Sequence, residues 1–311
     1  MMTKPQASRL LRATALARGT IPVLLVSGAI ACGPIATAGP GCSPVRTGLA
    51  LPPELNESSG VAVSLRHPGI FWTHNNVGSV LFAVDSEGAI LRRYLLDRRL
   101  RDWEDIAVSM CADGGSCLYM ADLGDNYEER QTQNLPMNLL RAAEPDPSDR
   151  ASGDTLQTEA FPVWLPDGER DIEAMMVLPG ERIYFVTKGR NHAVTVYRYP
   201  PPLRPDTVVL EEVQRLTERA RILPRQVTGG AVSPRGGVLA LRTYEVLQFY
   251  LMAGDTLAVM EDGLVNLRTL QEAQGEGVGI GLDGQVVLTS EGGPAGGPGG
   301  MTFLRCDFPG L

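Results

Sequence analysis

Short apolar segments alternate along this chain with turns that carry glycine, proline and aspartate. Five stretches repeat one order: a polar start, an apolar run, a tight turn, a second apolar run and a polar end. Two β-branched or aromatic runs around a tight turn predict a β-hairpin. The five stretches are 58–76, 104–126, 171–189, 227–245 and 275–293, and their turns read RHPG, CADGGSC, LPGE, SPRGG and LDG.

Further strand-like segments lie between these hairpins, which gives about four strands per repeat. The repeats begin near residues 59, 104, 172, 228 and 275, so their spacings are 45, 68, 56 and 47 residues. Four-stranded units of this length are typical of β-propeller blades. We therefore expect an all-β, single-domain propeller of five blades. A sixth blade inside the 68-residue interval, or a β-sandwich, is the alternative.

The fifth repeat shows only three strands. The segment VRTGLALP, near the start of the predicted domain, can supply the fourth and so join both termini in the last blade. Glycine and proline are abundant, at 35 and 23 residues, which favours turns over long helices.

The motifs WEDIA, DLGDN, DIEA, VTGGA, ALRTY, QGEG and TSEG occur in this order at blade spacing. Together they resemble a group of exported bacterial β-propeller proteins, largely uncharacterised, that are broadly TolB-like and gluconolactonase-like. The resemblance covers residues 54–306. It implies a propeller with a polar site at its axis and does not specify a substrate.

The first 53 residues contain no acidic side chain. Basic residues precede the apolar segment IPVLLVSGAIA at 21–31, as in a secretory signal, and the segment is too short to span a bilayer. AIAC resembles a bacterial lipobox, in which Cys32 would be lipidated, although Ala29 replaces the usual leucine. We expect a signal peptide at 1–31, a linker at 32–44 and the propeller at 45–311, in a protein exported to the periplasm, cell envelope or exterior.

Five cysteines fit an oxidising compartment. Cys111 and Cys117 flank a short loop and can bridge it. If Cys32 carries lipid, Cys42 and Cys306 remain near the two ends of the domain and can pair. Connectivity does not follow from sequence alone, so free thiols or another pairing stay open.

The net charge of −8 argues against nucleic acid or anionic lipid as the main partner. We expect a monomer that binds a small polar ligand or an envelope protein, and that meets the membrane only through a lipid anchor.

Two columns of polar residues follow from aligning the repeats, and in a propeller both lie near the axis. The first column, at the start of each inner strand, holds Ser59, Glu104 with Asp105, Glu173 with Asp171 nearby, Thr228 and Glu276. The second, at the end of the next strand, holds His74 with Asn75, Asp122, Lys188, Arg242 and Glu291. Tyr244 is expected at the rim.

These columns have three interpretations. Carboxylate and amide oxygens suit a hard cation such as Ca²⁺, and the candidate ligands are Glu104, Asp105, Asp122, Asp125, Asn126, Glu173 and Glu276. The ligand-binding candidates are His74, Asn75, Lys188, Arg242, Tyr244 and Glu291. The same charges can instead form a structural ion-pair network between blades, and DLGDN can be an ordinary turn.

Catalytic signatures of common hydrolases and nucleotide-binding enzymes are absent from the sequence. GIGLDG, at 279–284, fits a dinucleotide-binding pattern by letter but precedes a strand rather than a helix. If the protein is an enzyme, we expect a metal-dependent hydrolase of an ester, lactone or phosphoester. Glu173, Glu276 or Asp105 would then act as base, with His74 as acid. The preferred interpretation is a binding or scaffold protein of the cell envelope.

Overall fold

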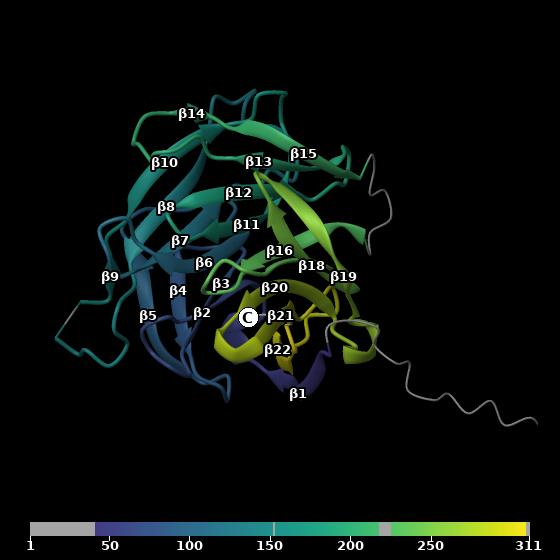
Figure 1. Cartoon of the computed structure of the whole chain (residues 1–311). Helices are drawn as coiled ribbons and strands as arrows, with labels where there is room; N and C mark the ends of the chain where they lie inside the picture. The colour runs from purple at the N-terminus through teal and green to yellow at the C-terminus, as the bar shows by residue number, and fades with distance from the viewer. Residues whose placement is uncertain (1–40, 152, 218–224, 309–311) are drawn as a thin grey trace, which may run out of the picture. The chain divides into compact units, whose positions relative to one another are not determined.

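The five predicted hairpins form the inner halves of five antiparallel sheets in the computed structural model, which describes residues 41–151, 153–217 and 225–308. The sheets follow one another as the blades of a five-bladed β-propeller (Figure 1). Period-two alternation buries one side chain in two along the outer strands, as in β5 (Ile90–Leu96), which exposes Leu91, Arg93 and Leu95 and buries the residues between them. The innermost strands are buried along most of their length.

Each blade begins with an inner strand and continues outward. Blade 1 contains β2 (Ser58–Val63), β3 (Phe71–Asn75), β4 (Val80–Val84) and β5 (Ile90–Leu96). Blade 2 contains β6 (Asp105–Met110), β7 (Ser116–Asp122), β8 (Met137–Ala143) and β10 (Glu159–Trp164). Blade 3 contains β11 (Ile172–Leu178), β12 (Arg182–Thr187), β13 (Val194–Arg198) and β15 (Glu211–Thr217).

Blade 4 contains β16 (Val227–Val232), β17 (Leu239–Thr243), β18 (Val246–Ala253) and β19 (Thr256–Asn266). Blade 5 contains β20 (Gln274–Ile280), β21 (Gln285–Glu291), β22 (Gly300–Arg305) and β1 (Ser43–Ala50). Helical structure in the described residues consists of short 3₁₀ turns, among them Pro53–Leu55, Arg268–Leu270 and Leu282–Gly284. None of the helices in these ranges is long and apolar enough to cross a membrane.

The 68-residue interval of blade 2 holds no sixth blade in its described part. Instead, β9 (Thr155–Leu156) crosses to pair in parallel with β5 of blade 1. In return, β14 (Val208–Val209), from the chain that leaves blade 3, pairs in parallel with β10 of blade 2. These exchanged strands explain the extra sequence, because each crossing needs connecting residues that add no blade.

Glycines let the five inner strands approach one another at the axis. A Cβ on Gly277 would lie 2.6 Å from the Ser59 carbonyl oxygen of blade 1, and one on Gly229 would lie 2.7 Å from the Glu276 carbonyl oxygen. Each inner strand contacts the next, and β20 contacts β2, so the ring is closed. A five-bladed ring is narrow, and the glycines of VTGGA and GEGVGIG supply the room that it needs.

The inner strands are polar where they start and apolar where they end. The apolar end surrounds a narrow pit, about 20 Å³, lined by residues such as Val61, Val108, Val177, Val232 and Ile280. Chemistry that depends on charge is therefore confined to the end of the axis where these strands begin.

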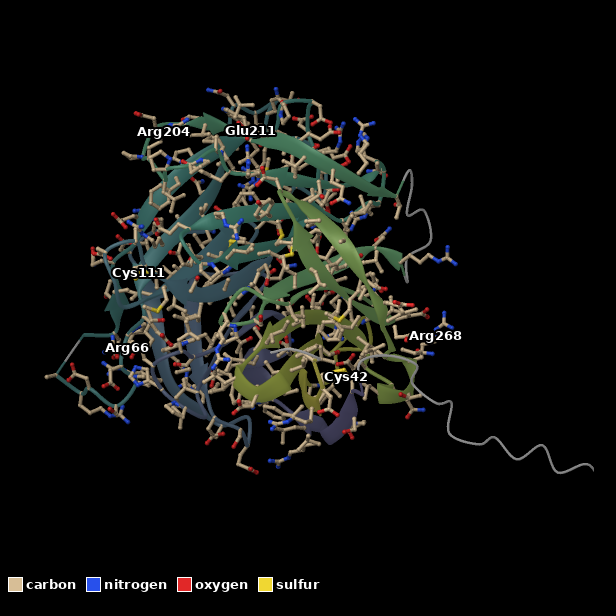
Figure 2. The ribbon with its side chains drawn as sticks, viewed as in Figure 1. Cys42, Arg66, Cys111, Arg204, Glu211 and Arg268 are labelled. Carbon is tan, nitrogen blue, oxygen red and sulfur yellow. A yellow bond between two sulfur atoms is a disulfide. The ribbon has the colours of Figure 1, made fainter. Side chains whose placement is uncertain are left out.

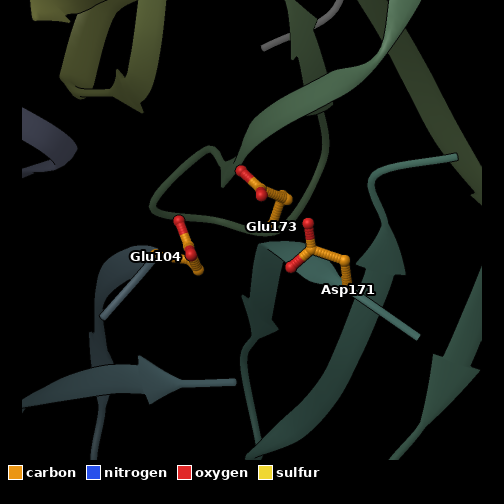
Figure 3. A group of neighbouring side chains, drawn as sticks. All are labelled: Glu104, Asp171 and Glu173. Carbon is orange, nitrogen blue, oxygen red and sulfur yellow. The ribbon is translucent and has the colours of Figure 1, made fainter. Parts of the chain in front are cut away.

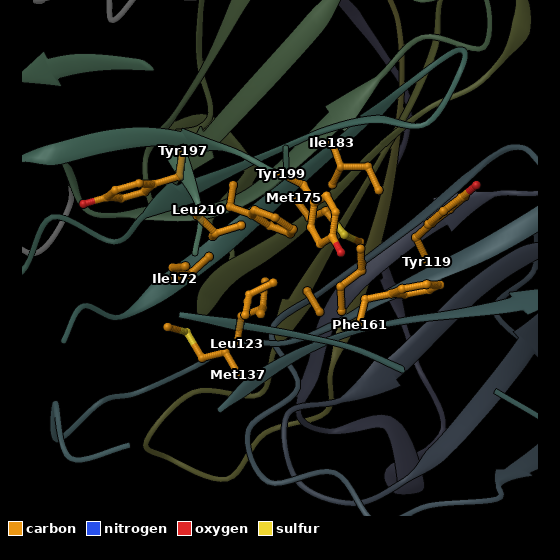
Figure 4. Packing of buried hydrophobic residues seen from close by; sticks show 14 of the residues in the cluster. Tyr119, Leu123, Met137, Phe161, Ile172, Met175, Ile183, Tyr197, Tyr199 and Leu210 are labelled. Carbon is orange, nitrogen blue, oxygen red and sulfur yellow. The ribbon is translucent and has the colours of Figure 1, made fainter. Parts of the chain in front are cut away.

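Hydrophobic clusters fill the spaces between blades. Between blades 2 and 3, Tyr119 and Phe161 pack with Met175 and Ile183 (Figure 4). Between blades 1 and 2, the fully buried Trp103 packs with Trp72 and Leu118. Since each cluster draws on two sheets, the blades hold one another in place.

Both predicted disulfides are present. Cys111–Cys117 bridges the base of the β6–β7 hairpin, and Cys42–Cys306 joins the residue before β1 to the residue after β22 (Figure 2 labels Cys42 and Cys111). The segment expected to complete the last blade forms β1, which pairs antiparallel with β22. Cys32 and the expected signal peptide lie outside the described residues.

Candidate metal centre at the propeller axis

Three buried carboxylates meet where the inner strands of blades 2 and 3 begin. Glu104 directly precedes β6, Asp171 directly precedes β11, and Glu173 is the second residue of β11. One oxygen of each lies within 4.8 Å of the others, and the side chains face one another (Figure 3). The residues are 3%, 6% and 2% exposed. We call these three residues the axial triad.

The triad holds more negative charge than its surroundings readily accommodate. Burial, followed by the negative charge of Glu173, raises the pKa of Glu104 well above its ordinary value. Burial and the neighbouring Asp171 likewise raise the pKa of Glu173 well above its ordinary value. Removing carboxylates from water and placing them side by side both disfavour the ionised form. The triad is therefore suited to bind a proton or a cation.

Lys188 is the cation that the chain itself supplies. It follows β12, and its Nζ donates to Glu173 Oε1 and lies 3.8 Å from Asp171 Oδ2. Burial lowers the pKa of Lys188, but the negative charges of Glu173 and Asp171 outweigh burial and raise it. The ammonium is thus firmly protonated, and one positive charge faces three carboxylates.

Two triad oxygens have no hydrogen-bond partner although they are buried: Glu104 Oε1 and Asp171 Oδ2. Buried polar atoms are nearly always paired, so within a group of three converging carboxylates these two oxygens are candidate ligand atoms. Gly124 keeps this place open, because a Cβ there would lie 2.2 Å from Glu104 Oε1. Oxygen-only donors are those that Ca²⁺ and Mg²⁺ prefer, so the residues present fit a hard divalent cation.

The solvent side of the triad is formed by Asp102, Asn126 and Arg190. Asp102 lies beside Glu104, since a Cβ on Gly124 would lie 2.2 Å from Glu104 Oε1 and 2.6 Å from Asp102 Oδ2. Burial raises the pKa of the half-buried Asp102, and the nearby side chains of Glu104 and Asn126 oppose this rise. Arg190 Nη2 lies 3.9 Å from Asp171 Oδ2. Asn126 therefore reaches the site through Asp102.

A second pair of carboxylates, Glu276 and Glu291, comes from blade 5. The Gln274 side-chain amide donates to both, at 2.7 Å to Glu276 Oε1 and 2.8 Å to Glu291 Oε2. Burial and the charge of Glu291 raise the pKa of Glu276 to about 8. Burial raises the pKa of Tyr244, which also feels the charges of Glu276, Lys188 and Glu173. These side chains bring blades 4 and 5 to the same end of the axis.

Asp105 follows Glu104 in sequence, but its carboxylate accepts hydrogen bonds from backbone N–H groups. Its Oδ2 accepts the N–H groups of Met175 and Gly230, at 2.8 and 3.0 Å, and its Oδ1 accepts that of Ile106. Burial nevertheless raises its pKa to about 8. With three N–H groups around its carboxylate, Asp105 links blades 2, 3 and 4 and lies outside the axial triad.

Asp122 and Asp125 also hold structure together. Asp122 Oδ1 accepts from Arg130 Nη2 at 2.8 Å and from the Asp102 N–H at 2.9 Å. The two oxygens of Asp125 accept the backbone N–H groups of residues 129 and 130, which closes a turn. This is the ordinary turn that was the alternative interpretation of DLGDN. The Asp125 N–H in turn donates to Asp171 Oδ1, which orients one triad member.

His74 is fully buried and stacks on Trp103, with ring centroids 4.0 Å apart. Its Nε2 accepts the Gly60 N–H at 3.2 Å, and burial lowers its pKa to about 3. The imidazole is therefore neutral and engaged in packing. Asn75 donates to the Glu54 carbonyl at 2.7 Å, outside the triad.

Arg242, fully buried, ties blade 4 to blade 5. Its Nη1 donates to the carbonyls of Gly277 and Thr289, at 2.7 and 2.9 Å, and its Nη2 pairs with Glu272. The small hydroxyls of the first column also join blades, since Ser59 donates to the Glu104 carbonyl at 3.0 Å. The structural network expected as one interpretation is thus present beside the triad.

Three neighbours of the site were missed from sequence: Asp102, Arg190 and Gln274. Asp102 was open to detection, because it precedes Glu104 by two residues and both flank a large aromatic that anchors the strand. Arg190 and Gln274 lie just outside the aligned columns, in a loop and at a strand start. Their side chains are long enough to reach the axis, and an alignment of strand positions does not take side-chain length into account.

The chain matches no protein-family model and no curated protein sequence. Among solved structures it is similar to the PQQ-bound form of aldose sugar dehydrogenase from Streptomyces coelicolor. That similarity has 12% identity and a TM-score of 0.50, and it covers 86% of this chain and 98% of that one.

It is also similar, with a TM-score of 0.40, to a gluconolactonase from Xanthomonas campestris, at 15% identity over 79% of this chain and 71% of that one. At such identities the similarity establishes the fold alone, which is a β-propeller.

Proposed function

We propose that this propeller binds a divalent cation through Glu104, Asp171 and Glu173 and uses it to hydrolyse a small ester, lactone or phosphoester. The observation that carries the proposal is the pair of buried, unpartnered oxygens, Glu104 Oε1 and Asp171 Oδ2, within a group of three converging carboxylates. A structural ion-pair network is the alternative, because Asp171 Oδ2 lies 3.8 Å from Lys188 Nζ and 3.9 Å from Arg190 Nη2. The cation titration described below separates the two.

Calcium is the cation that we propose first. The triad offers oxygens alone, without imidazole or thiolate, which disfavours zinc or copper. Calcium takes six to eight oxygens in flexible geometry, so water or substrate would complete the shell that three carboxylates begin. Asp102 stands next to this open side.

Glu276 is the proposed proton acceptor. A bound divalent ion would polarise the carbonyl or phosphoryl oxygen of the substrate. Glu276 has a pKa raised to about 8, and general bases work best when their pKa lies near the working pH. The other candidates are engaged elsewhere, since Glu173 bonds Lys188, Asp105 accepts three backbone N–H groups and His74 is packed in the core.

We further propose that the protein works outside the cytoplasm, in the periplasm, cell envelope or exterior, as a monomer. The two disulfides support an oxidising compartment. Lipidation at Cys32 and a binding role toward an envelope partner remain proposals that rest on the sequence. Labelling with a radioactive fatty acid, compared in the wild type and Cys32→Ala, tests the anchor.

Cation binding is tested by calorimetric titration of the chelator-treated full chain with CaCl₂, MgCl₂ and MnCl₂. We expect one site, with affinity reduced at least tenfold in Glu104→Gln and Asp171→Asn. Glu144→Gln is the matched control, because Glu144 is equally buried but bonds Ser64 and Trp72 and lies outside the triad. No binding by the wild type, or equal loss in the control, contradicts the proposal.

Hydrolysis is tested with a panel of esters, lactones and phosphoesters, with and without the preferred cation. We expect cation-dependent turnover that Glu276→Gln lowers by about two orders of magnitude, the usual contribution of a general base. The panel includes an aldose with PQQ, since the solved dehydrogenase of this fold is PQQ-bound. A bound cation without turnover on any substrate favours the binding role instead.

A further inference from the structure

The triad and Lys188 together carry a net charge that one divalent ion would neutralise. Glu104, Asp171 and Glu173 contribute three negative charges when ionised, and the Lys188 ammonium bonded to Glu173 contributes one positive charge. We infer that Lys188 is the residue that makes this site selective for divalent over trivalent cations. The inference rests on the proposed function, because it assigns the selectivity of the same site.

The position of Lys188 is fixed by the backbone on both sides. Its N–H donates to the Asp171 carbonyl at 2.9 Å, within blade 3, and its carbonyl accepts the Val227 N–H at 3.0 Å, from blade 4. The residue is 6% exposed, so its ammonium is buried beside the triad. Lys188 therefore contributes its charge at the place where a cation would bind.

The ammonium lies close enough to a bound cation to repel it strongly. Nζ contacts Glu173 Oε1 and lies 3.8 Å from Asp171 Oδ2, so two of the three ligands are shared between the ammonium and any incoming ion. Ligand oxygens hold Ca²⁺ at about 2.4 Å. The two positive charges would consequently stand a few ångströms apart in a poorly solvated place, where charges interact much more strongly than in water.

The other charges next to the triad nearly cancel. Asp102 adds a negative charge beside Glu104, and Arg190 adds a positive charge 3.9 Å from Asp171. Both are more exposed than Lys188, so solvent screens them more. Glu276 belongs to blade 5 and is held by Gln274. Lys188 is thus the buried positive charge that offsets part of the negative charge of the triad.

Replacement of Lys188 by methionine should raise cation affinity, in contrast to most substitutions in a binding site. Coulomb repulsion scales with the charge of the ion, so the logarithm of the gain should be about 1.5 times larger for a trivalent than for a divalent ion. If the affinity for Ca²⁺ rises about tenfold, that for Tb³⁺ should rise about thirtyfold.

The experiment measures Ca²⁺ and Tb³⁺ affinity on the full chain by calorimetry and by Tb³⁺ luminescence. The wild type is compared with Lys188→Met, with Lys188→Gln, which keeps a donor for Glu173, and with Lys188→Arg, which keeps the charge. We expect both neutral variants to gain affinity, more for Tb³⁺, and the arginine variant to keep the wild-type ratio. An unchanged or lower Tb³⁺-to-Ca²⁺ ratio in both neutral variants overturns the inference.

The two failures are distinguishable. A chain that binds no cation in any variant contradicts the proposed function, whereas a wild type that binds Ca²⁺ with unaltered selectivity in the neutral variants contradicts only the role of Lys188. If a neutral variant is unfolded without cation, its refolding is followed with Ca²⁺ or Tb³⁺ added. The inference is supported if the variant refolds at a Tb³⁺ concentration that is lower, relative to Ca²⁺, than the wild-type affinities predict. Refolding that does not depend on which ion is added counts against it.

Discussion

The Asp105 carboxylate accepts a hydrogen bond from the Gly230 N–H at 3.0 Å, across 125 residues of sequence. The same oxygen accepts the Met175 N–H, so one side chain joins the inner strands of three blades. Glycine at 230 permits this approach, since a Cβ there would lie 3.2 Å from the Met175 carbonyl oxygen. The two residues together set the spacing of blades 2, 3 and 4 at the axis.

Asp105→Ala should therefore destabilise the whole ring. It leaves three buried N–H groups without an acceptor, and each such group costs roughly 1–3 kcal/mol. Relief of the buried charge offsets part of this, so we expect a loss of about 3 kcal/mol. Urea denaturation measures it, with Asp113→Ala, at an exposed hairpin turn, as the control. A loss equal to that of the control would falsify the assigned role.

The stability of the cation-free protein should fall as pH rises from about 5 to 9. The pKa of Glu276 is raised by burial to about 8 from 4.5, so the folded state binds this proton more tightly than the unfolded state does. Its stabilising contribution is complete below the unfolded pKa and is lost as pH rises through the folded pKa. Melting temperatures in chelator at each pH test this, and Glu276→Gln should flatten the profile. An identical slope in that variant would mean that other groups set it.

Gly277→Ala should separate blade 5 from blade 1. The added Cβ would lie 2.4 Å from Thr289 Oγ1 and 2.6 Å from the Ser59 carbonyl oxygen, and both atoms belong to strands that cannot easily yield. Overpacking of this kind costs about 3 kcal/mol. Gly153→Ala is the matched control, because a Cβ on Gly153 would meet no other atom within 4 Å. Thermal melting of both variants provides the comparison, and equal melting temperatures would argue against a closed ring.

The two disulfides should differ in their contribution to stability. Cys42–Cys306 closes a loop with a sequence separation of 264, whereas Cys111–Cys117 has a separation of 6. In the chain-entropy description the first stabilises by roughly 5 kcal/mol and the second by roughly 2 kcal/mol. Paired serine variants of each bridge, compared in denaturant, test this order. A larger loss on removing Cys111–Cys117 would show that local strain or packing dominates.

The repeat layout was predictable because each blade carries its own local signals. The alternating strands, the turns at LPGE and SPRGG, and the polar residue that opens each inner strand all arise within about twenty residues. Stacking of such units around an axis then follows, since one hairpin cannot bury its faces alone. The exchanged strands β9 and β14 were not predictable, because two residues of parallel pairing leave no pattern in the sequence.

The sequence did not predict which contacts each acidic side chain makes at the axis. Glu104 and Asp105 are neighbours, yet successive side chains on a strand point in opposite directions. One reaches the triad and the other reaches the backbone of two further blades. Asp122 likewise meets Arg130 rather than Glu104. Which acids stay unpartnered depends on donors that arrive from distant strands, so polar columns locate the site without assigning its members.

The pairing of β1 with β22 makes blade 5 depend on two distant parts of the chain. Among the described strands β1 comes first in sequence, and its partner, Gly300–Arg305, comes last. The four antiparallel strands of each of blades 1 to 4 lie close together in sequence, although β9 and β14 join blades 1 and 2 from later in the chain. Blade 5 instead joins β1 to a strand about 250 residues later, and Cys42 to Cys306 at a sequence separation of 264. A chain without β22 would therefore leave the edges of β1 and β21 unpaired, and unpaired strand edges favour aggregation.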